Sequence, residues 1–406
     1  MDRDPDVCVV GGGPAGMVLA LLLVRAGLRV TVLEKHADFL RDFRGDTVHA
    51  STLDLMDAIG LGDRLLALPH RKVTALRATF DDGTFVLADF GRLPPPHPYL
   101  AFLPQWDFLN LLASAGADYP GFRLLTSTAA TGLVREGGRV VGVRATGPDG
   151  ELTVRAALTV AADGRGSLVR EQLGLVPRDF GAPMDVLWFR VPREDSDPEG
   201  LDMRIGPGQL AILIDRGSYY QIAYVIAKGG HAAVVARGLP AFRDGVARVA
   251  PFLADRLDAI ADWSDVKVLT VTINRLRRWY QPGVLLIGDA AHAMSPIGGV
   301  GINLAVQDAV AAARLLAPAL RAGRVTGADL ARVQRRRQWP TAVVQFGQRM
   351  VQTQFVGRLL GTDRPVRAPR PLRLLGRFPF LQGIPARVVG RGLRREQPPP
   401  AGAARR

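Results

Sequence analysis

The feature that most constrains this sequence is the glycine-rich segment Gly11–Gly16, close to the start of the chain. It follows the apolar run Val7–Val10 and opens Pro14–Ala26, in which apolar residues recur at helical spacing. A second β-branched apolar run follows at Arg29–Leu33. The order strand, turn, helix, strand predicts one βαβ unit, and therefore an α/β fold built on a parallel sheet.

The glycines of this turn have separate physical roles. Gly11 allows a tight turn, Gly13 lets the backbone approach a pyrophosphate, and Gly16 lets the helix pack closely on the strand. The helix N-terminus then offers free N–H groups and a positive dipole end to phosphates. Glu34 ends the second strand, where a carboxylate can accept both ribose hydroxyls and would repel a 2′-phosphate. The unit predicts FAD or NAD rather than NADP, the alternative being a turn without a ligand.

Charge and cysteine content narrow the class of protein. The chain of 406 residues has a net charge of +14, but its arginines are spread along the chain with no basic stretch interleaved with aromatics, so we expect no nucleic-acid partner. The single cysteine, Cys8, permits no internal disulfide and suits a reducing compartment. The apolar run Met17–Val24 is far shorter than the roughly 20 residues of a membrane span. We expect a cytoplasmic protein, with membrane association unlikely and no metal site.

Two later segments also end a strand at an acidic residue. Leu158–Arg170 carries Asp163 before a glycine, although a simple turn capped by Ser167 would look the same. Val284–Asp308 carries Asp289, then a glycine-rich loop and a helix that starts near residue 300. A carboxylate at a strand end can hold a sugar-like hydroxyl, and a second helix N-terminus can face an anion.

These three segments, in this order, resemble the flavin-dependent aromatic hydroxylases, the single-component class A FAD monooxygenases of the para-hydroxybenzoate hydroxylase fold. Arg44 resembles an arginine that the family uses near the FAD pyrophosphate, and Gln105 a residue beside the ribityl chain. The sequence departs from the family at Val300, where members commonly have Gln between two glycines. The resemblance implies a Rossmann-like FAD-binding domain with an inserted β-sheet substrate domain and C-terminal helices.

The expected domains are discontinuous. Residues 1–70, 101–176 and 277–325 would form the FAD-binding domain, and residues 71–100 and 177–276 the β-rich substrate domain. Residues 326–395 would be a helical region, with 364–395 packed against the FAD domain because its prolines argue against a membrane-surface helix. The proline-rich end, 396–406, is expected to be a disordered tail.

The resemblance also implies which residues bind the cofactor. Pro296 would line the flavin ring on the substrate side and take part in catalysis. His292 is a candidate catalytic base, its alternative being a scaffold role. The implied FAD-binding set is Gly11, Gly13, Pro14, Ala15, Gly16, Glu34, Lys35, Arg44, Gln105, Asp163, Asp289, Pro296, Gly299, Val300, Gly301, Ile302 and Asn303.

The sequence has no second strand–glycine–helix unit for a nicotinamide dinucleotide. The resemblance therefore implies that NADH or NADPH visits FAD transiently, that O2 then forms a flavin C4a-hydroperoxide, and that an aromatic substrate is hydroxylated or epoxidised. The expected strand Gln209–Ile214 is apolar on both faces, which favours a large aromatic, polyketide-like or quinolone-like substrate. Arg190, Tyr220 and Tyr224 are candidate substrate contacts, or ordinary sheet residues.

Other functions stay open at this point. A flavin-dependent reductase or dehydrogenase would share these motifs but insert no oxygen. A non-enzymatic flavoprotein would bind the cofactor without turnover. A halogenase is disfavoured, because the nearest match to its tryptophan signature, Trp188–Pro192, lacks the second Trp. The chain is expected to be a monomer or a homodimer.

Overall fold

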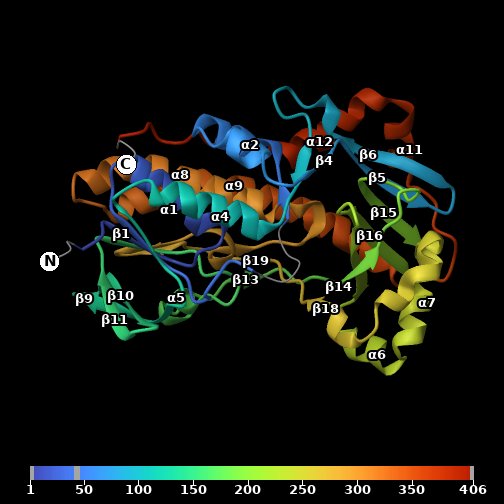
Figure 1. Cartoon of the computed structure of the whole chain (residues 1–406), viewed down its shortest axis with the longest axis horizontal. Helices are drawn as coiled ribbons and strands as arrows, with labels where there is room; N and C mark the ends of the chain where they lie inside the picture. Colours follow the sequence, from blue (N-terminus) through green and yellow to red (C-terminus); the bar gives the residue numbers. More distant parts are fainter. Residues whose placement is uncertain (1–3, 41–45, 403–406) are drawn as a thin grey trace.

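The computed structural model describes residues 4–40 and 46–402 of the chain. Figure 1 shows two halves along the longest axis: one in which long helices lie on a sheet, and one in which a second sheet carries α6 and α7. The chain crosses between the halves more than once, because the strands of the second sheet come from residues 75–89 and 184–269.

The first half is built on a six-stranded sheet in the order β20-β21-β12-β1-β2-β8. Its strands are β1 (Val7–Val10), β2 (Val30–Leu33), β8 (Phe122–Leu125), β12 (Leu158–Ala161), β20 (Tyr280–Gln281) and β21 (Val284–Leu286). The pairs β1–β2, β1–β12, β2–β8 and β12–β21 are parallel, while the edge strand β20 is antiparallel to β21. Every residue of β1 is buried, as expected for a parallel strand covered on both faces.

Four helices cover one face of this sheet: α1 (Pro14–Arg25), α4 (Gln105–Ala117), α8 (Gly301–Arg321) and α9 (Gly327–Val351). Helix α1 starts at a proline, which suits the first helical position, and the chain leaves it through Gly27 at φ +84°. Its residues Ala15–Val24 are all buried, because α1 lies between the sheet and the neighbouring helices α4 and α8.

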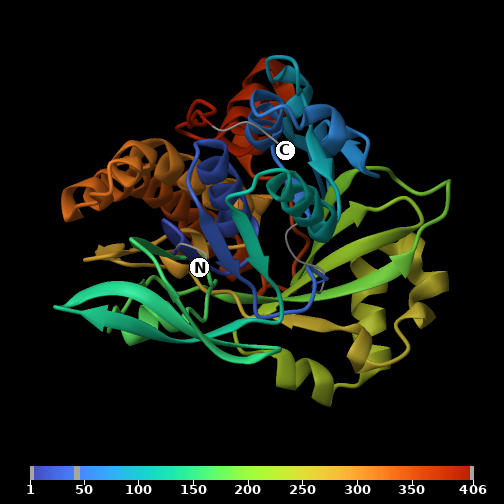
Figure 2. The ribbon, with the colours of Figure 1, turned by 60° about the vertical axis from the view of Figure 1, so that its left-hand side comes forward.

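The opposite face is covered by an antiparallel sheet, β11-β10-β9, which Figure 2 shows at the lower left. Its strands are β9 (Ala129–Glu136), β10 (Arg139–Gly147) and β11 (Gly150–Arg155), and helix α5 (Leu168–Gln172) packs on β9. Side chains from both sheets share one apolar cluster that includes Cys8, Val140 and Val143. The parallel sheet is therefore buried between two layers.

The second half is built on a seven-stranded sheet in the order β18-β14-β17-β16-β15-β5-β6. The strands are β5 (Ala75–Phe80), β6 (Gly83–Asp89), β14 (Met184–Pro192), β15 (Leu201–Gly206), β16 (Gln209–Asp215), β17 (Tyr219–Ala227) and β18 (Lys267–Leu269). Its outer face packs on α6 (His231–Ala236), α7 (Leu239–Val249) and the 3-10 turns η2 (Pro251–Ala259). The other face of this sheet points toward the interior of the molecule.

Shorter elements connect the two halves. The small strands are β3 (Thr47–Val48), β4 (Arg71–Val73), β7 (Leu100–Phe102), β13 (Arg178–Asp179), β19 (Asn274–Arg275) and β22 (His292–Ala293). The helices are α2 (Ala50–Ala58), α3 (Gly62–Leu66), η1 (Phe90–Arg92), η3 (Trp263–Asp265), η4 (Gly288–Ala290) and η5 (Ile297–Gly299). Strand β7 pairs with both β3 and β4, next to the border between the halves.

The C-terminal region is helical and comprises η6 (Gln352–Val356), α10 (Gly357–Leu359), α11 (Arg370–Arg377), η7 (Pro379–Gln382) and α12 (Gly383–Gly390). The sequence predicted that this region packs against the domain built on the six-stranded sheet, but it also packs on the second half. Helices α11 and α12 contact β6, and Leu372 shares an apolar cluster with Phe80 and Ile205 of the second sheet. The amphipathic pattern of this region is satisfied by covering the sheet edge.

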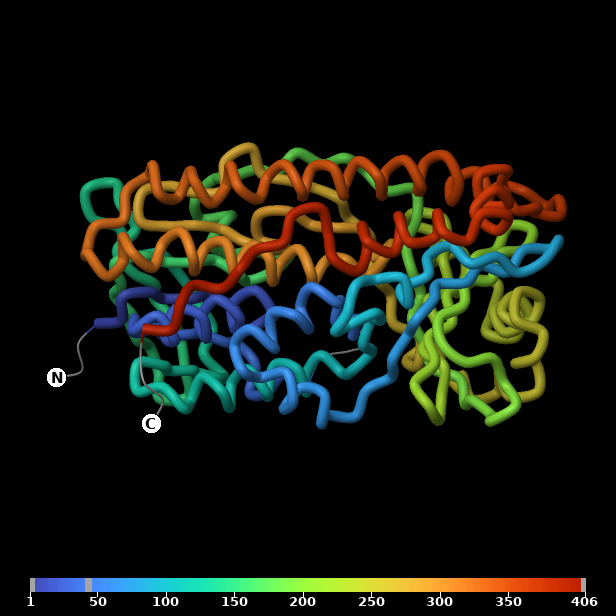
Figure 3. The backbone as a smooth tube through the Cα atoms, turned by 90° about the horizontal axis from the view of Figure 1, so that it is seen from above, coloured from blue at the N-terminus to red at the C-terminus, as the bar shows by residue number. Residues whose placement is uncertain are grey.

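The expectation of a disordered tail from residue 396 is wrong for residues 396–402. Figure 3 shows this segment running back along the molecule toward the N-terminal end. The Glu396 carboxylate is fully buried and pairs with Arg314, Arg336 and Arg337 at 3.0, 2.8 and 3.4 Å. Gly402 N donates to Arg25 O at 2.7 Å. The prolines of the segment exclude regular structure but do not prevent packing.

One helix of the described residues, 297–321, is long and apolar enough to span a membrane. However, 78% of its apolar window is buried inside the fold, where α8 lies between α1 and α9. Its hydropathy is explained by its position in the core. We propose that the FAD-binding and substrate domains divide as expected from the sequence, because the six-stranded and seven-stranded sheets have separate apolar clusters.

Candidate active site

The glycine turn has the geometry that close approach requires. Gly11 has φ +106°, and a Cβ atom there would lie 2.4 Å from the carbonyl oxygen of Ala162. A Cβ at Gly16 would lie 2.0 Å from the carbonyl oxygen of Gly11. Both positions therefore exclude a side chain, whereas a Cβ at Gly13 would meet open space. The first turn of α1 is left facing an open volume with its N–H groups free of side-chain caps.

Glu34 directly follows β2 and lies against this turn. Its Oε2 accepts a hydrogen bond from Gly12 N at 2.9 Å, and Oε1 accepts one from His36 N at 3.0 Å. The residue is 6% exposed. Backbone donors thus fix a buried carboxylate beside the helix N-terminus, in the place where the sequence predicted a ribose-binding group.

The two later acidic motifs meet at the carboxyl ends of adjacent strands. Asp163 follows β12 and Asp289 follows β21, and these strands are paired in parallel. Arg165, two residues after Asp163, reaches the second motif, because its Nε donates to Asp289 Oδ2 at 3.1 Å. Val169 N donates to Asp163 Oδ2 at 3.2 Å, whereas the buried Asp163 Oδ1 has no partner among the described residues. Burial raises the pKa of Asp163 against the hydrogen bonds that lower it.

The loop before α8 closes the same region. Gly298 and Gly299 have φ +78° and +63°, and a Cβ at Gly299 would lie 3.3 Å from Thr47 Oγ1. These glycines let the chain turn from Pro296 into α8, whose first residue is Gly301. The N-terminus of α8 therefore adds a second positive dipole end to the site.

All of these segments border one cavity of about 700 Å³. Its FAD-side wall carries eleven residues of the predicted cofactor set: Gly13, Pro14, Ala15, Lys35, Gln105, Asp163, Asp289, Pro296, Gly299, Gly301 and Ile302. Most of the remaining wall is apolar and comes from the inner face of the second sheet, with Trp188, Ile212 and Val225 among its members. Residues Val351, Phe355, Val356 and Val389 extend this wall from the C-terminal region.

The residues present fit FAD. Glycines that tolerate no Cβ, a fixed carboxylate at Glu34 and a buried, unpartnered oxygen at Asp163 are a suitable set for a pyrophosphate and its flanking hydroxyls. The family model described as FAD binding domain matches the chain over residues 4–347. The chain belongs to this family.

Relatives narrow the family to FAD-dependent monooxygenases. The chain is 35% identical over 389 residues to a 6-methylpretetramide 4-monooxygenase of Streptomyces rimosus, which covers 95% of this chain and 92% of the relative. It is 32% identical over 317 residues to an anhydrotetracycline monooxygenase of Streptomyces rimosus, covering 75% of this chain and 61% of that relative. A solved anhydrotetracycline hydroxylase of Streptomyces rimosus superimposes with a TM-score of 0.74 at 27% identity, covering 99% of this chain and 78% of that one.

These comparisons confirm the predicted fold class and the class A FAD-dependent monooxygenase family. Within the monooxygenase, five described residues of the predicted cofactor set do not line the cavity: Gly11, Gly16, Glu34, Val300 and Asn303. The first three form or contact the glycine turn, and the last two turn away from the cavity. Val300 packs with Met294 and Leu304, and Asn303 Oδ1 accepts hydrogen bonds from Ser51 and Thr52 of α2 at 2.6 and 3.3 Å. Their side chains anchor the start of α8 instead. Arg44 lies outside the described residues.

The predicted substrate contacts Tyr220 and Tyr224 lie on the wrong face of the second sheet. On β17, Gln221, Ala223 and Val225 line the cavity, so the alternate residues face the outer helices. The Tyr220 ring lies 5.9 Å from Phe252 and the Tyr224 ring 5.6 Å from Phe242, both in that outer layer. The structure therefore corrects both assignments.

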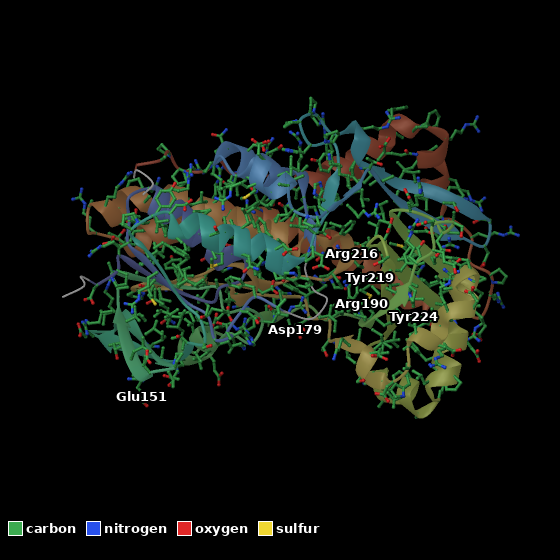
Figure 4. All side chains as sticks on the ribbon, viewed as in Figure 1. Glu151, Asp179, Arg190, Arg216, Tyr219 and Tyr224 are labelled. Carbon is green, nitrogen blue, oxygen red and sulfur yellow. The ribbon has the colours of Figure 1, made fainter. Side chains whose placement is uncertain are left out.

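Arg190, the third candidate contact, does not line the cavity either. It lies on the same side of β14 as Trp188, and its guanidinium is 4.9 Å from the ring of Tyr219. Figure 4 shows Arg190, Tyr219 and Arg216 close together at the end of the second sheet that faces the FAD-side half. Arg190 therefore places a positive charge near the cavity without lining its wall.

The structure contradicts a catalytic role for His292. Its ring is 1% exposed, and Nε2 lies 2.6 Å from Asp308 Oδ2, inside the fold and off the cavity wall. Arg337 Nε donates to Asp308 Oδ1 at 2.9 Å, and Arg337 also reaches Glu396. We call Asp308, His292, Arg337 and Glu396 the helix cluster, because it joins α8, α9 and the C-terminal segment.

The sequence did not predict many of the cavity residues, and among these Asp46, Arg216 and Gln221 form one polar group. Arg216 lies in the turn between β16 and β17, and Asp46 directly precedes β3. A single charged residue before a short strand, or in a turn between strands, carries no signal by itself. The described residues include no group of three or more His, Cys, Asp or Glu side chains that could hold a metal ion.

Proposed function

We propose that this monooxygenase uses NADH or NADPH and O2 to hydroxylate, or epoxidise, a large aromatic or polyketide-like small molecule. The observation that carries the proposal is that one cavity has the FAD-binding motifs on one wall and an apolar sheet on the other. The names of the relatives, 6-methylpretetramide 4-monooxygenase and anhydrotetracycline monooxygenase, support a polycyclic substrate of this kind.

The apolar wall supports a large substrate over a small aromatic acid. Leu210, Ile212 and Ile214 present the cavity face of β16, and the strand offers no charged group along it. A small benzoate would need a paired cation to offset the desolvation of its carboxylate. A flat apolar ring system is bound by burying its surface against the wall, because burying apolar surface contributes about 25 cal/mol per Å².

The chain's own residues would bind and orient the cofactor. Gly11–Gly16 and Glu34 would hold the adenosine and pyrophosphate part, with Asp163, Asp289 and Gln105 further along the cavity. The N-terminus of α8 would place its positive end at the flavin ring, and Pro296 would separate ring from substrate. When bound, FAD supplies the transfer of electrons from the nicotinamide to O2 and of one oxygen atom to the substrate.

The nicotinamide co-substrate is proposed to bind transiently, because the sequence contains one glycine fingerprint and FAD would occupy it. The co-substrate is NADH or NADPH in this proposal. We further propose a cytoplasmic location and a monomeric or homodimeric state. The two acidic groups and Arg165 at the strand ends would lie along the path of that co-substrate.

A substrate panel tests the proposal. The FAD-loaded protein is mixed with tricyclic and tetracyclic phenols, and separately with small benzoates, while NADH or NADPH consumption is recorded. The bulky phenols are expected to stimulate consumption and to gain one oxygen atom that carries label from 18O2. Stimulation without labelled product would favour the reductase or dehydrogenase alternative, and no stimulation by any compound would favour a non-enzymatic flavoprotein.

A further inference from the structure

Three polar side chains meet on the otherwise apolar substrate side of the cavity. Arg216 Nη2 donates to Asp46 Oδ2, and Arg216 Nε and Nη2 donate to Gln221 Oε1 at 3.0 and 2.9 Å. Gln105 N also donates to Asp46 Oδ1 at 3.3 Å. We call Asp46, Arg216 and Gln221 the cavity cluster. It brings together the start of β3, the β16–β17 turn and the inner face of β17.

The cavity cluster is almost shielded from solvent. The side chains of Arg216 and Asp46 are 7% and 12% exposed, and what remains open faces the cavity that all three residues line. The Arg216 guanidinium also lies 5.4 Å from the ring of Phe102. Its orientation is therefore fixed from two sides before any ligand enters.

Charged groups of both signs surround Asp46 and Arg216. Burial raises the pKa of Asp46, although the charges of Arg216 and Arg190 and hydrogen bonds from Gln105 and Gln221 lower it. Burial lowers the pKa of Arg216, and Asp215 and Tyr219 are the other ionisable groups beside it. Asp46 in this setting holds a proton more readily than an exposed carboxyl does.

Filling the cavity imposes a cost at this point. A flat apolar ligand would remove water from Asp46 and Arg216 and leave polar atoms without partners, which weakens its binding. A ligand with a hydroxyl at the same point recovers that cost. Sites that contain polar groups of this kind discriminate strongly against analogues that lack the matching hydroxyl.

We propose that the cavity cluster is a binding subsite for an acidic phenol or enol hydroxyl of the substrate. The substrate O–H bond breaks, its proton forms an O–H bond on the Asp46 carboxylate, and the resulting oxyanion faces Arg216. This deepens the proposed function and rests on its substrate class. Gln221 and the Gln105 N–H are positioning groups that hold the arginine and the carboxylate.

The transfer keeps the net charge of the cavity unchanged. Before it, Asp46 is negative and the hydroxyl neutral; after it, Asp46 is neutral and the substrate oxygen negative. No new net charge has to be buried, so the large desolvation cost of an isolated ion is avoided. An ionised phenol or enol is more electron-rich at its ring carbons than the neutral form. The subsite would thus both orient the substrate and raise its reactivity toward an electrophilic oxygen.

Binding of alizarin, which is 1,2-dihydroxyanthraquinone, tests this subsite without turnover. Its visible absorption moves to longer wavelength when its phenol ionises, so the spectrum reports the protonation state of the bound dye. The FAD-loaded protein is titrated with alizarin, and with its dimethyl ether, without nicotinamide or oxygen. Flavin-only spectra are subtracted, and retained FAD checks folding in each variant.

The matched variants alter two carboxylate–arginine pairs, one on the cavity wall and one away from it. Asp46→Asn, Arg216→Gln and Arg216→Lys change the cavity cluster. Asp202→Asn and Arg204→Gln change the pair Asp202–Arg204 on β15, which is 2.6 Å apart and off the cavity wall. Arg216→Lys keeps the positive charge and so remains informative if either neutral variant loses FAD.

We expect the wild type to shift the alizarin spectrum at a pH low enough that the free dye is not ionised, and to bind alizarin at least about tenfold more tightly than the ether. Asp46→Asn and Arg216→Gln should abolish the shift, Arg216→Lys should keep part of it, and both β15 variants should keep all of it. Absence of a shift in the wild type, or a full shift in Asp46→Asn, would overturn the subsite. The 18O2 test of oxygen insertion is independent of this spectrum, so the two proposals fail separately.

Discussion

The helix cluster and the cavity cluster are both buried groups of carboxylates and arginines, yet they differ in what they face. In the helix cluster, Asp308 is enclosed by His292, Arg337 and the Gly288 N–H, and its side chain is 0% exposed. In the cavity cluster, the Asp46 side chain is 12% exposed and opens onto the cavity. Similar chemistry therefore has a structural use in one place and a proposed binding use in the other.

The pKa values of the two carboxyls move in opposite directions. Burial alone would raise the pKa of Asp308, but the charges of His292 and Arg337 and their hydrogen bonds outweigh it and lower the pKa. At Asp46, burial outweighs Arg216 and raises the pKa. A carboxylate whose partners outweigh its burial stabilises the fold, whereas one whose burial outweighs its partners is retained at a cost to stability, as functional groups often are.

The largest expected effect in this comparison is on the helix cluster. Asp308→Asn should lower the free energy of unfolding by about 3–5 kcal/mol, because it leaves Arg337 as a buried charge without its main partner. Urea unfolding of the FAD-loaded protein, followed by circular dichroism, measures the change. Asp46→Asn is the matched variant and should cost less than about 2 kcal/mol, since water in the cavity can solvate Arg216. Equal losses in both variants would remove the distinction between the clusters.

The next effect concerns the C-terminal segment. Glu396→Gln should lower the free energy of unfolding by about 2–3 kcal/mol, because Arg314, Arg336 and Arg337 lose a shared buried carboxylate. The exposed neighbour Gln397 offers a control, and Gln397→Ala should leave stability unchanged. Thermal unfolding of both variants compares them, and a Glu396→Gln protein as stable as wild type would show that residues 396–402 do not hold the fold together.

A smaller effect is expected at His292. His292→Asn should cost about 1–2 kcal/mol through loss of its hydrogen bond to Asp308, while substrate-stimulated NAD(P)H oxidation stays within about twofold of wild type. Unfolding curves and initial rates on one preparation give both numbers. A large loss of rate in a protein that is still folded and FAD-loaded would restore His292 as a catalytic group.

The smallest effect is the pH dependence, and its sign separates the clusters. The lowered pKa of Asp308 gives stability that is present above its ordinary value of 3.8 and is lost as the pH falls through the lower folded pKa. The raised pKa of Asp46 makes ionised Asp46 destabilising, so stability is regained as the pH falls from neutral through the raised folded pKa. The advantage of wild type over Asp308→Asn should therefore shrink on acidification.

The advantage of wild type over Asp46→Asn should instead grow between neutral pH and about pH 4.5, a pH above the ordinary value of the carboxyl. Urea unfolding of wild type and both variants at a series of pH values measures both trends in the free energy of unfolding. The same direction of change in both variants would contradict the opposite pKa shifts on which the comparison depends.

The parts of the site carried by local sequence could be predicted. The turn Gly11–Gly16, Glu34 and the two acidic strand ends each depend on a few consecutive residues, and parallel strands bring Asp163 and Asp289 to one edge of the sheet. The apolar character of Gln209–Ile214 likewise follows from its residues alone. The assignments that failed depended on direction: Tyr220 and Tyr224 are on the correct strand but on its outer face.

The sequence by itself determined the βαβ unit, the cofactor class that its glycines and carboxylate accept, and the family. The tertiary structure decided which face of β17 meets the cavity, that His292 is enclosed by Asp308, and that Asp46 meets Arg216 across 170 positions of sequence. The physical reason is that a local pattern fixes how side chains alternate along an element. Only packing decides which side is covered by helices, which faces the ligand, and which distant charges are left together between them.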